Sequence, residues 1–281
     1  MEYTLVISLL IIATNVIVSN KGFKSIEFFN RYSFEVEKVI LYKQYDRIVT
    51  SGFLHVNWMH LIFNMLSLFL FSGSLAAILN PFSYLLVYFG SLICGNLFAL
   101  LIHKKDGDYS SVGASGAISG LIFAAIALAP GFSIGLFFIP IGIPGWIFGL
   151  AFVLYSIYGI RSRKTNVGHE AHLGSAITGM LIGILLDPSV LRYNLFPILV
   201  ILIPSLFFLY IIIKKPHLLL VDNLFYKQHS KYYTIEDKYN SRKVDTQKQV
   251  DQILEKIHKR GMNSLTRKEK EILDEYSKTV R

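Results

Sequence analysis

The sequence has little charge, and most of that charge lies at one end. Of 281 residues, 17% are charged and 53% are hydrophobic, whereas soluble domains carry about 25% charged residues. Residues 1–213 hold 21 charged side chains, and the much shorter segment 214–281 holds 26. This split excludes a single soluble domain, a disordered chain and a fibrous repeat. We therefore expect a membrane-embedded body followed by a water-soluble tail.

Three further absences narrow the possible functions. The single cysteine, Cys94, excludes an internal disulfide and a cysteine-rich zinc site, and its apolar neighbours predict a packing role. No repeat of 20–50 residues is visible, which argues against a transporter built from internal repeats. No aromatic-basic RNA motif is present, so the net charge of +9 predicts attraction to anionic lipid headgroups and no nucleic-acid partner.

Seven apolar stretches have roughly the length that crosses a hydrocarbon layer of about 30 Å. We expect each to form a helix, which predicts an all-α multi-pass membrane protein. The first stretch lacks a basic leader and a small-residue cleavage site, so it is predicted to be a retained helix. Residues 131–144 are predicted to form a re-entrant or interfacial piece. The seven stretches lie at about 3–19, 59–79, 82–102, 115–130, 145–160, 171–186 and 195–213.

Two segments outside these stretches carry their own patterns. Loop 21–58 interleaves apolar residues with Lys and Glu, which predicts short helices lying in the membrane interface. The chain end 242–281 is predicted to be a small helical hairpin, joined to the body by a basic linker at 214–241. Its first helix should bury Val250, Ile253, Leu254 and Ile257 and end at Gly261. A capping box of Thr266 and Glu269 should open the second helix, which carries Ile272, Leu273 and Tyr276.

Polar residues inside a membrane are functional candidates, because burying them without a partner costs several kcal/mol. His60 and Asn64 are four residues apart and therefore share a helix face. Two other predicted helices carry stripes of small residues that allow close approach. One stripe is Gly116, Gly120 and Ala124, and the other is His172, Ser175, Gly179 and Gly183.

Packing these two stripes together would bring Ser115 and His172 to the same depth, each near the start of its helix. A serine hydroxyl becomes a strong nucleophile when a base takes its proton, and histidine can be that base. An asparagine side chain or a backbone N–H can hold the developing oxyanion. The parts of a serine hydrolase are therefore present within a membrane body.

These motifs resemble those of the rhomboid intramembrane serine proteases over about residues 3–190. The family's His-x4-His-x3-Asn pattern is met by His55, His60 and Asn64, and its Ala-His pair by Ala171 and His172. Its Gly-x-Ser-Gly motif is met by Gly113, Ala114, Ser115 and Gly116. The loop-one Trp-Arg signature is half present, because Arg47 follows Asp46 and not a tryptophan.

The resemblance implies a fold and a set of roles. The fold is a six-helix bundle over 1–190, to which this chain adds a seventh helix at 191–213. Ser115 would be the nucleophile and His172 the general base, with no aspartate as a third member. His60, Asn64 and the Ser115 backbone N–H would form the oxyanion hole, and Gly113 and Gly116 would support the nucleophile. No metal or organic cofactor is implied.

The sequence departs from the family at positions near the predicted base. Many relatives have an aromatic residue where this chain has Ser119, and glycine where it has Ser175. The orientation of His172 is therefore less determined than its identity. Outside the dyad, we expect His55 to brace its loop by hydrogen bonding, Arg47 to anchor loop one at the headgroups, and Glu170 to be solvated or paired.

The predicted function is an intramembrane serine endopeptidase that cleaves transmembrane helices of other proteins, with the lipid bilayer as its second partner. Helix-weakening residues in the substrate would allow it to unwind into the site. One alternative is a rhomboid-like protein that binds membrane helices without cutting them, or cuts them weakly. Two others are a channel or transporter that relays protons through histidines, and a metal site of His55, His60 and His172. The oligomeric state is left open.

Orientation is the point on which two predictions conflict. Leaving out the tail, the loops on the side of the predicted site hold 11 Lys and Arg residues, and the opposite side holds only Arg192. The positive-inside rule therefore places the mouth of the site in the cytoplasm. The family resemblance, which suggests a bacterial plasma (inner) membrane, implies a mouth that faces outward. Both orientations stay open.

Overall fold

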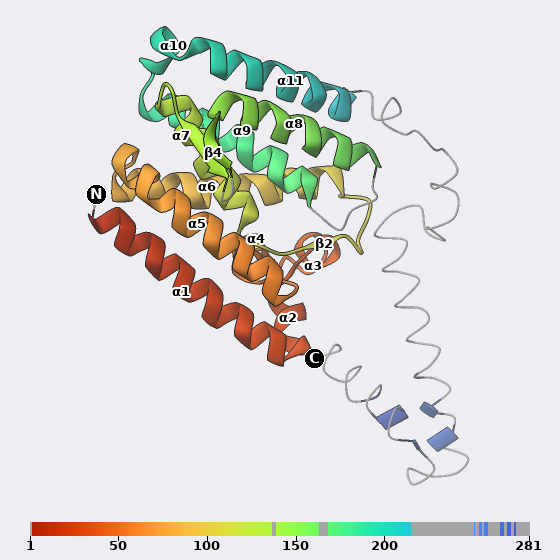
Figure 1. Ribbon diagram of the computed structural model, residues 1–281. Coiled ribbons are helices and arrows are strands. Elements are labelled where there is room, and N and C mark those ends of the chain that lie inside the picture. The colour runs from red at the N-terminus through yellow and green to blue at the C-terminus, as the bar shows by residue number, and fades with distance from the viewer. Residues whose placement is uncertain are drawn as a thin grey trace. The chain divides into compact units, whose positions relative to one another are not determined.

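The computed structural model of the chain describes residues 2–136, 139–162 and 168–214, together with positions 250, 253–254, 256–257, 265–266, 269–270 and 273. The chain divides into two compact units, Met1–Asn223 and Leu224–Arg281. Helices dominate the first unit (Figure 1). This agrees with the predicted all-α multi-pass membrane protein.

Each of the seven predicted spans coincides with a helix. Four of these helices are 18 to 23 residues long and apolar enough to cross a membrane, namely α1, α5, α6 and α9. The shorter α7 nevertheless forms the centre of the bundle, because residues 116–127 are all buried. The helices are α1 (Glu2–Lys24), α5 (Trp58–Ile78), α6 (Pro81–Ile102), α7 (Ser115–Leu128), α8 (Gly145–Ser162), α9 (His169–Leu186) and α11 (Leu195–Lys214).

The predicted contact between the two small-residue stripes is confirmed. A Cβ atom at Gly179 of α9 would lie 2.5 Å from the Cα and the carbonyl carbon of Gly120 in α7. One turn further along α9, a Cβ atom at Gly183 would lie 3.2 Å from the Cα of Ala124. Only residues without bulky side chains allow two backbones to come this close. The stripes therefore determine how α7 and α9 sit against each other.

The third member of this packed core is α6. Gly95 of α6 lies against Ser175 and the carbonyl of Ala171, and the Ser175 hydroxyl donates to the carbonyl of Ser91 at 2.8 Å. Ser175 thus uses its extra hydroxyl to bind a neighbouring helix. Cys94 lies on the exposed face of α6, so its predicted packing role in the core is wrong: the helix turns its neighbours Gly95 and Ser91 inward instead.

Loop one contains the short helices that the sequence predicts. It is formed by α2 (Ile26–Tyr32), β1 (Phe34–Glu35), α3 (Val36–Ile40), α4 (Arg47–Thr50) and the 3-10 turn η1 (Ser51–Phe53). Strand β1 pairs antiparallel with β2 (Ser110–Ser111), with Phe34 opposite Ser111 and Glu35 opposite Ser110. Loop one is thereby tied to the segment that leads into α7.

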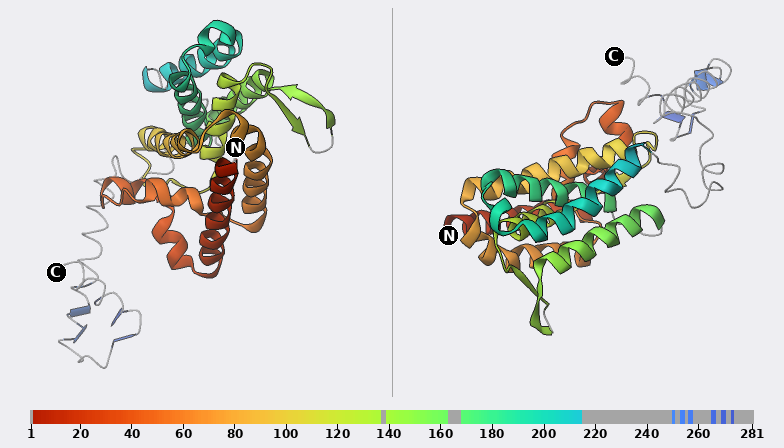
Figure 2. Two further views of the ribbon diagram at one scale, coloured as in Figure 1. Left: turned by 90° about the vertical axis from the view of Figure 1, so that its left-hand side faces the viewer. Right: turned by 90° about the horizontal axis from the view of Figure 1, so that it is seen from above.

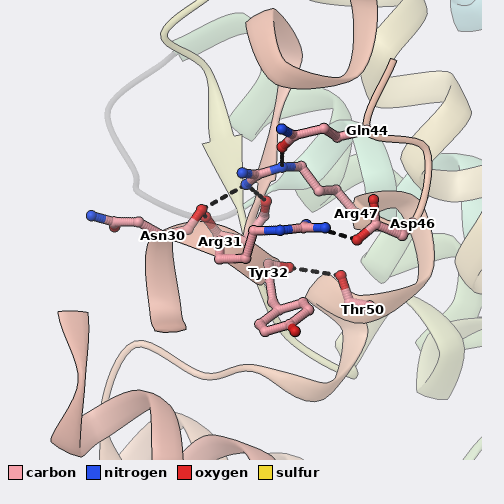
Figure 3. Close-up of polar contacts among 8 residues, drawn as sticks. Asn30, Arg31, Tyr32, Gln44, Asp46, Arg47 and Thr50 are labelled. Atoms are coloured by element: carbon pink, nitrogen blue, oxygen red, sulfur yellow. Dashed lines mark hydrogen bonds and ion pairs between the residues drawn. The ribbon is translucent and has the colours of Figure 1, made fainter. Parts of the chain in front are cut away.

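Arg47 holds loop one together from within. Its Nη1 donates to the carbonyl oxygens of Asn30 at 2.6 Å and Ser33 at 2.7 Å, and its Nε donates to Gln44 Oε1 at 2.7 Å (Figure 3). Only 3% of the residue is exposed. The predicted structural role agrees with these contacts, but the predicted contact with headgroups is wrong, because loop carbonyls provide the partners that a buried guanidinium requires.

Asp46 stands where the family has tryptophan, and the structure shows what it does. Its carboxylate forms an ion pair with Arg31 at 2.8 Å across the exposed side of loop one (Figure 3). Asp46 thus forms a charged contact between α2 and the start of α4.

Within 131–144, which the sequence predicts to be a re-entrant or interfacial piece, the described residues form two short strands. Strands β3 (Ser133–Leu136) and β4 (Ile139–Pro144) pair antiparallel, and Figure 2 shows them extending away from the helices of the first unit. After α9, the short helix α10 (Val190–Tyr193) leads into α11. The Asn194 amide donates at 2.8 Å to the carbonyls of Ile126 and Ala127, so it caps the end of α7 that is far from Ser115.

In the second unit, the described residues show part of the predicted hairpin. Val250 and Ile253 are buried as predicted, but Leu254 is 51% exposed and does not belong to the buried stripe. Leu254 follows Val250 by four residues, so helical spacing alone did not distinguish it from the buried positions. Gly261, Ile272, Tyr276 and linker residues 215–241 lie outside the described residues.

The predicted capping box is confirmed. The backbone N–H of Thr266 donates to Glu269 Oε2 at 2.7 Å, and the N–H of Glu269 donates to Thr266 Oγ1 at 3.3 Å. Glu269 also forms an ion pair with Lys256 at 2.8 Å. One carboxylate therefore serves both the start of its own helix and a contact with the preceding one.

Candidate active site

The structure brings Ser115 and His172 together. Ser115 is the first residue of α7 and His172 lies in the first turn of α9. The Ser115 Oγ lies 2.5 Å from the His172 Nε2, although the residues are 57 positions apart in sequence. The close packing of α7 on α9 explains this approach, since Ser115 directly precedes the small-residue stripe of α7 and His172 is the first residue of the stripe of α9.

Gly113 makes room for the site. Its φ of +131° lies in a region that L-residues with side chains rarely adopt. A Cβ atom at this position would also lie 2.9 Å from the Cε1 and 3.0 Å from the Nε2 of His60, and 3.6 Å from the Ser115 Oγ. Gly113 therefore lies between the Nε2 edge of His60 and the Ser115 hydroxyl, and both conformation and space require glycine.

His60 and Asn64 lie on one face of α5, as their spacing predicts. The helix is capped by Asn57, whose side-chain oxygen accepts from the His60 backbone N–H at 2.9 Å. The buried Asn64 amide donates to the His60 carbonyl at 3.0 Å. A primary amide has two N–H donors, so this bond uses one of them. The predicted part of Asn64 in an oxyanion hole stays a prediction.

His55 is fully buried and is braced by α1. Its Nδ1 lies 2.9 Å from the Ser19 Oγ, and that hydroxyl also donates to the Phe53 carbonyl at 2.9 Å. Because a hydroxyl has one proton and a carbonyl can only accept, His55 Nδ1 must donate to Ser19. The predicted bracing by hydrogen bonding is therefore observed, and its partner is a serine of the first helix.

The environment of His55 keeps its ring neutral. Burial, and then the nearby His60, lower the pKa of His55 to about 3. The two rings meet edge to face with centroids 4.9 Å apart. His55 thus offers His60 a rigid, uncharged neighbour with a defined tautomer.

The aromatic neighbour of His172 comes from a helix that sequence reasoning did not consider. Phe152 of α8 places its ring 6.0 Å from the His172 ring, at an interplanar angle of 35°. Ser119, at the position where relatives have the aromatic residue, donates its hydroxyl to the Ser115 carbonyl at 2.7 Å. No local signal marked Phe152, because it is one of several apolar residues in a predicted span.

Two further residues stand beside His172 in α9. The ring of the buried His169 lies 6.4 Å from that of His172 and 5.0 Å from that of Tyr155. Glu170 pairs with His103 at 3.1 Å, so the prediction that Glu170 is solvated or paired is confirmed as a pairing. Within the described residues, His, Cys, Asp and Glu side chains form no group of three that could hold a metal ion, which includes the three-histidine alternative.

Comparison with known proteins gives the site its context. The family described as "Rhomboid domain" matches residues 42–189, more than half of the chain. A second match, to a "Family of unknown function (DUF6576)", covers residues 233–279. The second match coincides with the tail and assigns it no activity.

Individual relatives carry rhomboid names. "Rhomboid protein 1, mitochondrial" of Saccharomyces cerevisiae is 35% identical over 139 residues, which are 48% of this chain and 40% of that protein. "RHOMBOID-like protein 12, mitochondrial" of Arabidopsis thaliana is 30% identical over 145 residues, which are 46% of this chain and 43% of that protein. "Putative rhomboid protease YdcA" of Bacillus subtilis is 45% identical over 75 residues, 27% of this chain and 37% of that protein.

The chain spans less than half of the length of these relatives. The matched part nevertheless contains every element of the site described above except Ser19, from Arg47 in loop one to His172 in α9. Its fold, its motifs and the family match agree, and this chain belongs to the rhomboid family.

Proposed function

We propose that this protein is an intramembrane serine endopeptidase that cleaves transmembrane segments of other membrane proteins with a Ser115–His172 dyad. The observation that carries the proposal is the distance of 2.5 Å between Ser115 Oγ and His172 Nε2. Membership of the rhomboid family supports a protease-like function. The burial of both helices within an apolar bundle supports a substrate that is itself a membrane helix.

In the proposed reaction, Ser115 Oγ attacks the carbonyl carbon of the scissile peptide bond while His172 Nε2 takes the hydroxyl proton. The tetrahedral intermediate collapses to an acyl-enzyme as His172 gives that proton to the leaving amine. Water then attacks the ester by the same route, with His172 again as the base. The carboxylic acid product leaves, and Ser115 regains its proton.

The oxyanion of each tetrahedral intermediate needs donors that are already in place. The Ser115 backbone N–H belongs to the first turn of α7, where helical N–H groups have no partner within the helix. The Nε2 edge of His60 lies on the other side of Gly113. We assign these two groups, with Asn64, to the oxyanion hole.

Substrate recognition follows from the properties of a membrane helix. Peptide bonds in a helix are shielded by their own hydrogen bonds, so substrates should carry helix-weakening residues near the cut. The family resemblance adds a small residue before the scissile bond. Loop one and α8 are proposed to flank the entry route from lipid. In this organisation 1–190 is the catalytic domain, 191–213 an additional transmembrane helix, 214–241 a linker and 242–281 a separate hairpin.

The membrane that we propose is a bacterial plasma membrane, supported by the 45% identity to the Bacillus subtilis relative. The two other relatives carry mitochondrial names, so fractionation of the native host is the deciding measurement. A reporter fused after residue 281, scored for cytoplasmic or external activity, reports the side on which the tail lies.

Cleavage by purified protein tests the proposal. Ser115→Ala should abolish cleavage of a panel of single-span reporter proteins in proteoliposomes, and should abolish labelling by a fluorophosphonate probe. Ser133→Ala is the matched control, because it removes an exposed hydroxyl from β3 at the other end of α7. Cleavage that persists in Ser115→Ala would refute the dyad. Reporter binding by native protein without cleavage or labelling would favour the non-proteolytic alternative.

A further inference from the structure

Two carboxylates face one imidazole at the end of α6. His103 follows the last residue of α6, and its Nε2 lies 3.1 Å from Glu170 Oε1 of α9. Its Nδ1 lies 3.7 Å from Asp106 Oδ2. The side chains of His103 and Glu170 are only 12% and 10% exposed, whereas that of Asp106 is 60% exposed. The His103–Glu170 pair is therefore shielded from water, and Asp106 closes it on the outer side.

This geometry favours a protonated His103. A ring with one carboxylate 3.1 Å from its Nε2 and another 3.7 Å from its Nδ1 is best matched by a positively charged imidazolium. Burial lowers the pKa of His103, but the contacts with Asp106 and Glu170 outweigh burial, and the pKa lies above its ordinary value of 6.5.

Tyr109 is the other titratable group in contact with His103. The two rings are stacked with centroids 3.6 Å apart and an interplanar angle of 11°. Burial and then the Glu170 charge raise the pKa of Tyr109, so its hydroxyl stays neutral. His169, next to Glu170 in α9, also interacts electrostatically with that carboxylate. The titratable groups of this cluster are thus His103, Glu170, Asp106, Tyr109 and His169.

The cluster lies between the two segments on which the proposed dyad depends. Glu170 is in the first turn of α9, two residues before His172. His103 opens the loop that ends at Ser115. On its other side this loop is held by loop one, because the N–H groups of Val36 and Glu37 donate to the carbonyls of Tyr109 and Gly107, both at 3.1 Å. The His103–Glu170 pair is the charged contact between that anchored loop and α9.

We propose that Glu170 is a positioning residue for the reaction at Ser115 and His172. Its ion pair with protonated His103 holds the first turn of α9 against the loop 103–114, and so keeps the His172 imidazole within hydrogen-bonding distance of the Ser115 hydroxyl. Glu170 contacts neither Ser115 nor the proposed position of the substrate, and it acts through the backbone of α9. This inference rests on the proposed Ser115–His172 function.

A pH dependence follows from the pair. Because the folded-state pKa of His103 is raised, the ion pair is complete below pH 6.5 and weakens as the pH rises through that raised pKa. A neutral imidazole loses the Coulomb attraction to the Glu170 carboxylate, so a neutral His103 holds α9 less firmly. The high-pH side of the activity profile should therefore report on His103.

The test compares kcat, KM and pH profiles of reporter cleavage by the full chain in proteoliposomes. Glu170→Gln keeps the shape and removes the charge. Glu170→Gln should lower kcat about 10- to 100-fold with KM little changed. It should also flatten the high-pH limb of the profile of cleavage rate against pH. Asp106→Asn removes the exposed carboxylate, which is not on α9. Asp106→Asn should shift the high-pH limb of the activity profile to lower pH, while the variant keeps nearly full activity at pH 6.

His103→Lys provides the second variant, because its ammonium stays charged to about pH 10. It should remain active and lose the high-pH limb. Thermal unfolding in detergent gives a readout without activity: Glu170→Gln should lower Tm at pH 6 and much less at pH 9. An active native enzyme whose rate, pH profile and Tm difference are unaffected by Glu170→Gln would overturn the inference while the proposed function stands. Native protein that neither cleaves nor is labelled at any pH would overturn the proposed function itself.

Discussion

Replacing Gly179 by alanine tests whether the packing of α7 on α9 determines the Ser115–His172 distance. The added Cβ would lie 2.5 Å from the Cα and the carbonyl carbon of Gly120, and closer still to its carbonyl oxygen. These are backbone atoms, which cannot turn away as a side chain can. Ordinary contacts begin at 3.4 Å, so α7 and α9 must move apart by about 1 Å at this level.

The size of the effect follows from the helix geometry. Gly179 is seven residues from His172, and Gly120 is five from Ser115, which corresponds to about 10 Å and 8 Å along the helices. Over such short lengths a helix moves as a rigid body, so the present 2.5 Å between Oγ and Nε2 should grow to about 3.5 Å, beyond a good hydrogen bond. A misplacement of about 1 Å can lower a rate about 100-fold. Overpacking should also lower the free energy of unfolding by about 1–3 kcal/mol.

The assay is reporter cleavage in proteoliposomes, measured beside thermal unfolding of the same preparation. Two alanine variants serve as controls. Gly183→Ala places its Cβ 3.2 Å from Ala124, which requires a shift of only a few tenths of an ångström, and Gly73→Ala meets no atom within 4 Å. The cleavage rate should be highest for Gly73→Ala, lower for Gly183→Ala and lowest for Gly179→Ala. The reasoning is refuted if Gly179→Ala matches Gly73→Ala in both rate and Tm.

Three other outcomes follow from the contacts described. His55→Ala leaves its buried hydrogen bond with α1 unmade and should lower stability by about 1–3 kcal/mol, measured by thermal unfolding; an unchanged Tm would contradict the bracing role. Asn194→Ala removes two hydrogen bonds to α7 and should also lower Tm. It should leave kcat within about twofold of the native value, because the change is remote from the site; a large loss of kcat would contradict this separation of stability from activity. In the tail, contacts with Lys256 and then Thr266 lower the pKa of Glu269 to about 2. The stabilising contribution of Glu269 is therefore present above pH 4.5 and lost as the pH falls towards 2. The NMR signal of the Thr266 amide should change over this pH range, and Glu269→Gln should abolish that change.

The helices of the membrane body could be predicted because the constraint on them is local. A segment in hydrocarbon must satisfy its backbone polar groups internally and present apolar side chains, and both requirements can be recognised in a single stretch of sequence. The juxtaposition of Ser115 with His172 was predictable for a related reason. Stripes of small residues let two membrane helices approach to backbone contact, and both residues stand at the start of such stripes.

Partners that come from distant segments could not be predicted. Arg47 is a charged loop residue in sequence, and only the folded loop supplies the carbonyls that bury it. Residues 131–144 are apolar apart from Ser133, so no alternation of polar and apolar residues distinguished the observed pair of strands from a re-entrant piece. In each case the outcome depends on which groups meet in space.

By itself, the sequence determined a membrane body with seven apolar helices, a charged tail, and the residue types for a serine–histidine site, because hydropathy and helical spacing are properties of single segments. Only the tertiary structure decided the surroundings of that site: Phe152 beside the His172 ring, Ser19 behind His55, and His103 paired with Glu170. These contacts join residues from different helices. Their distances depend on how whole helices cross, which no local pattern encodes.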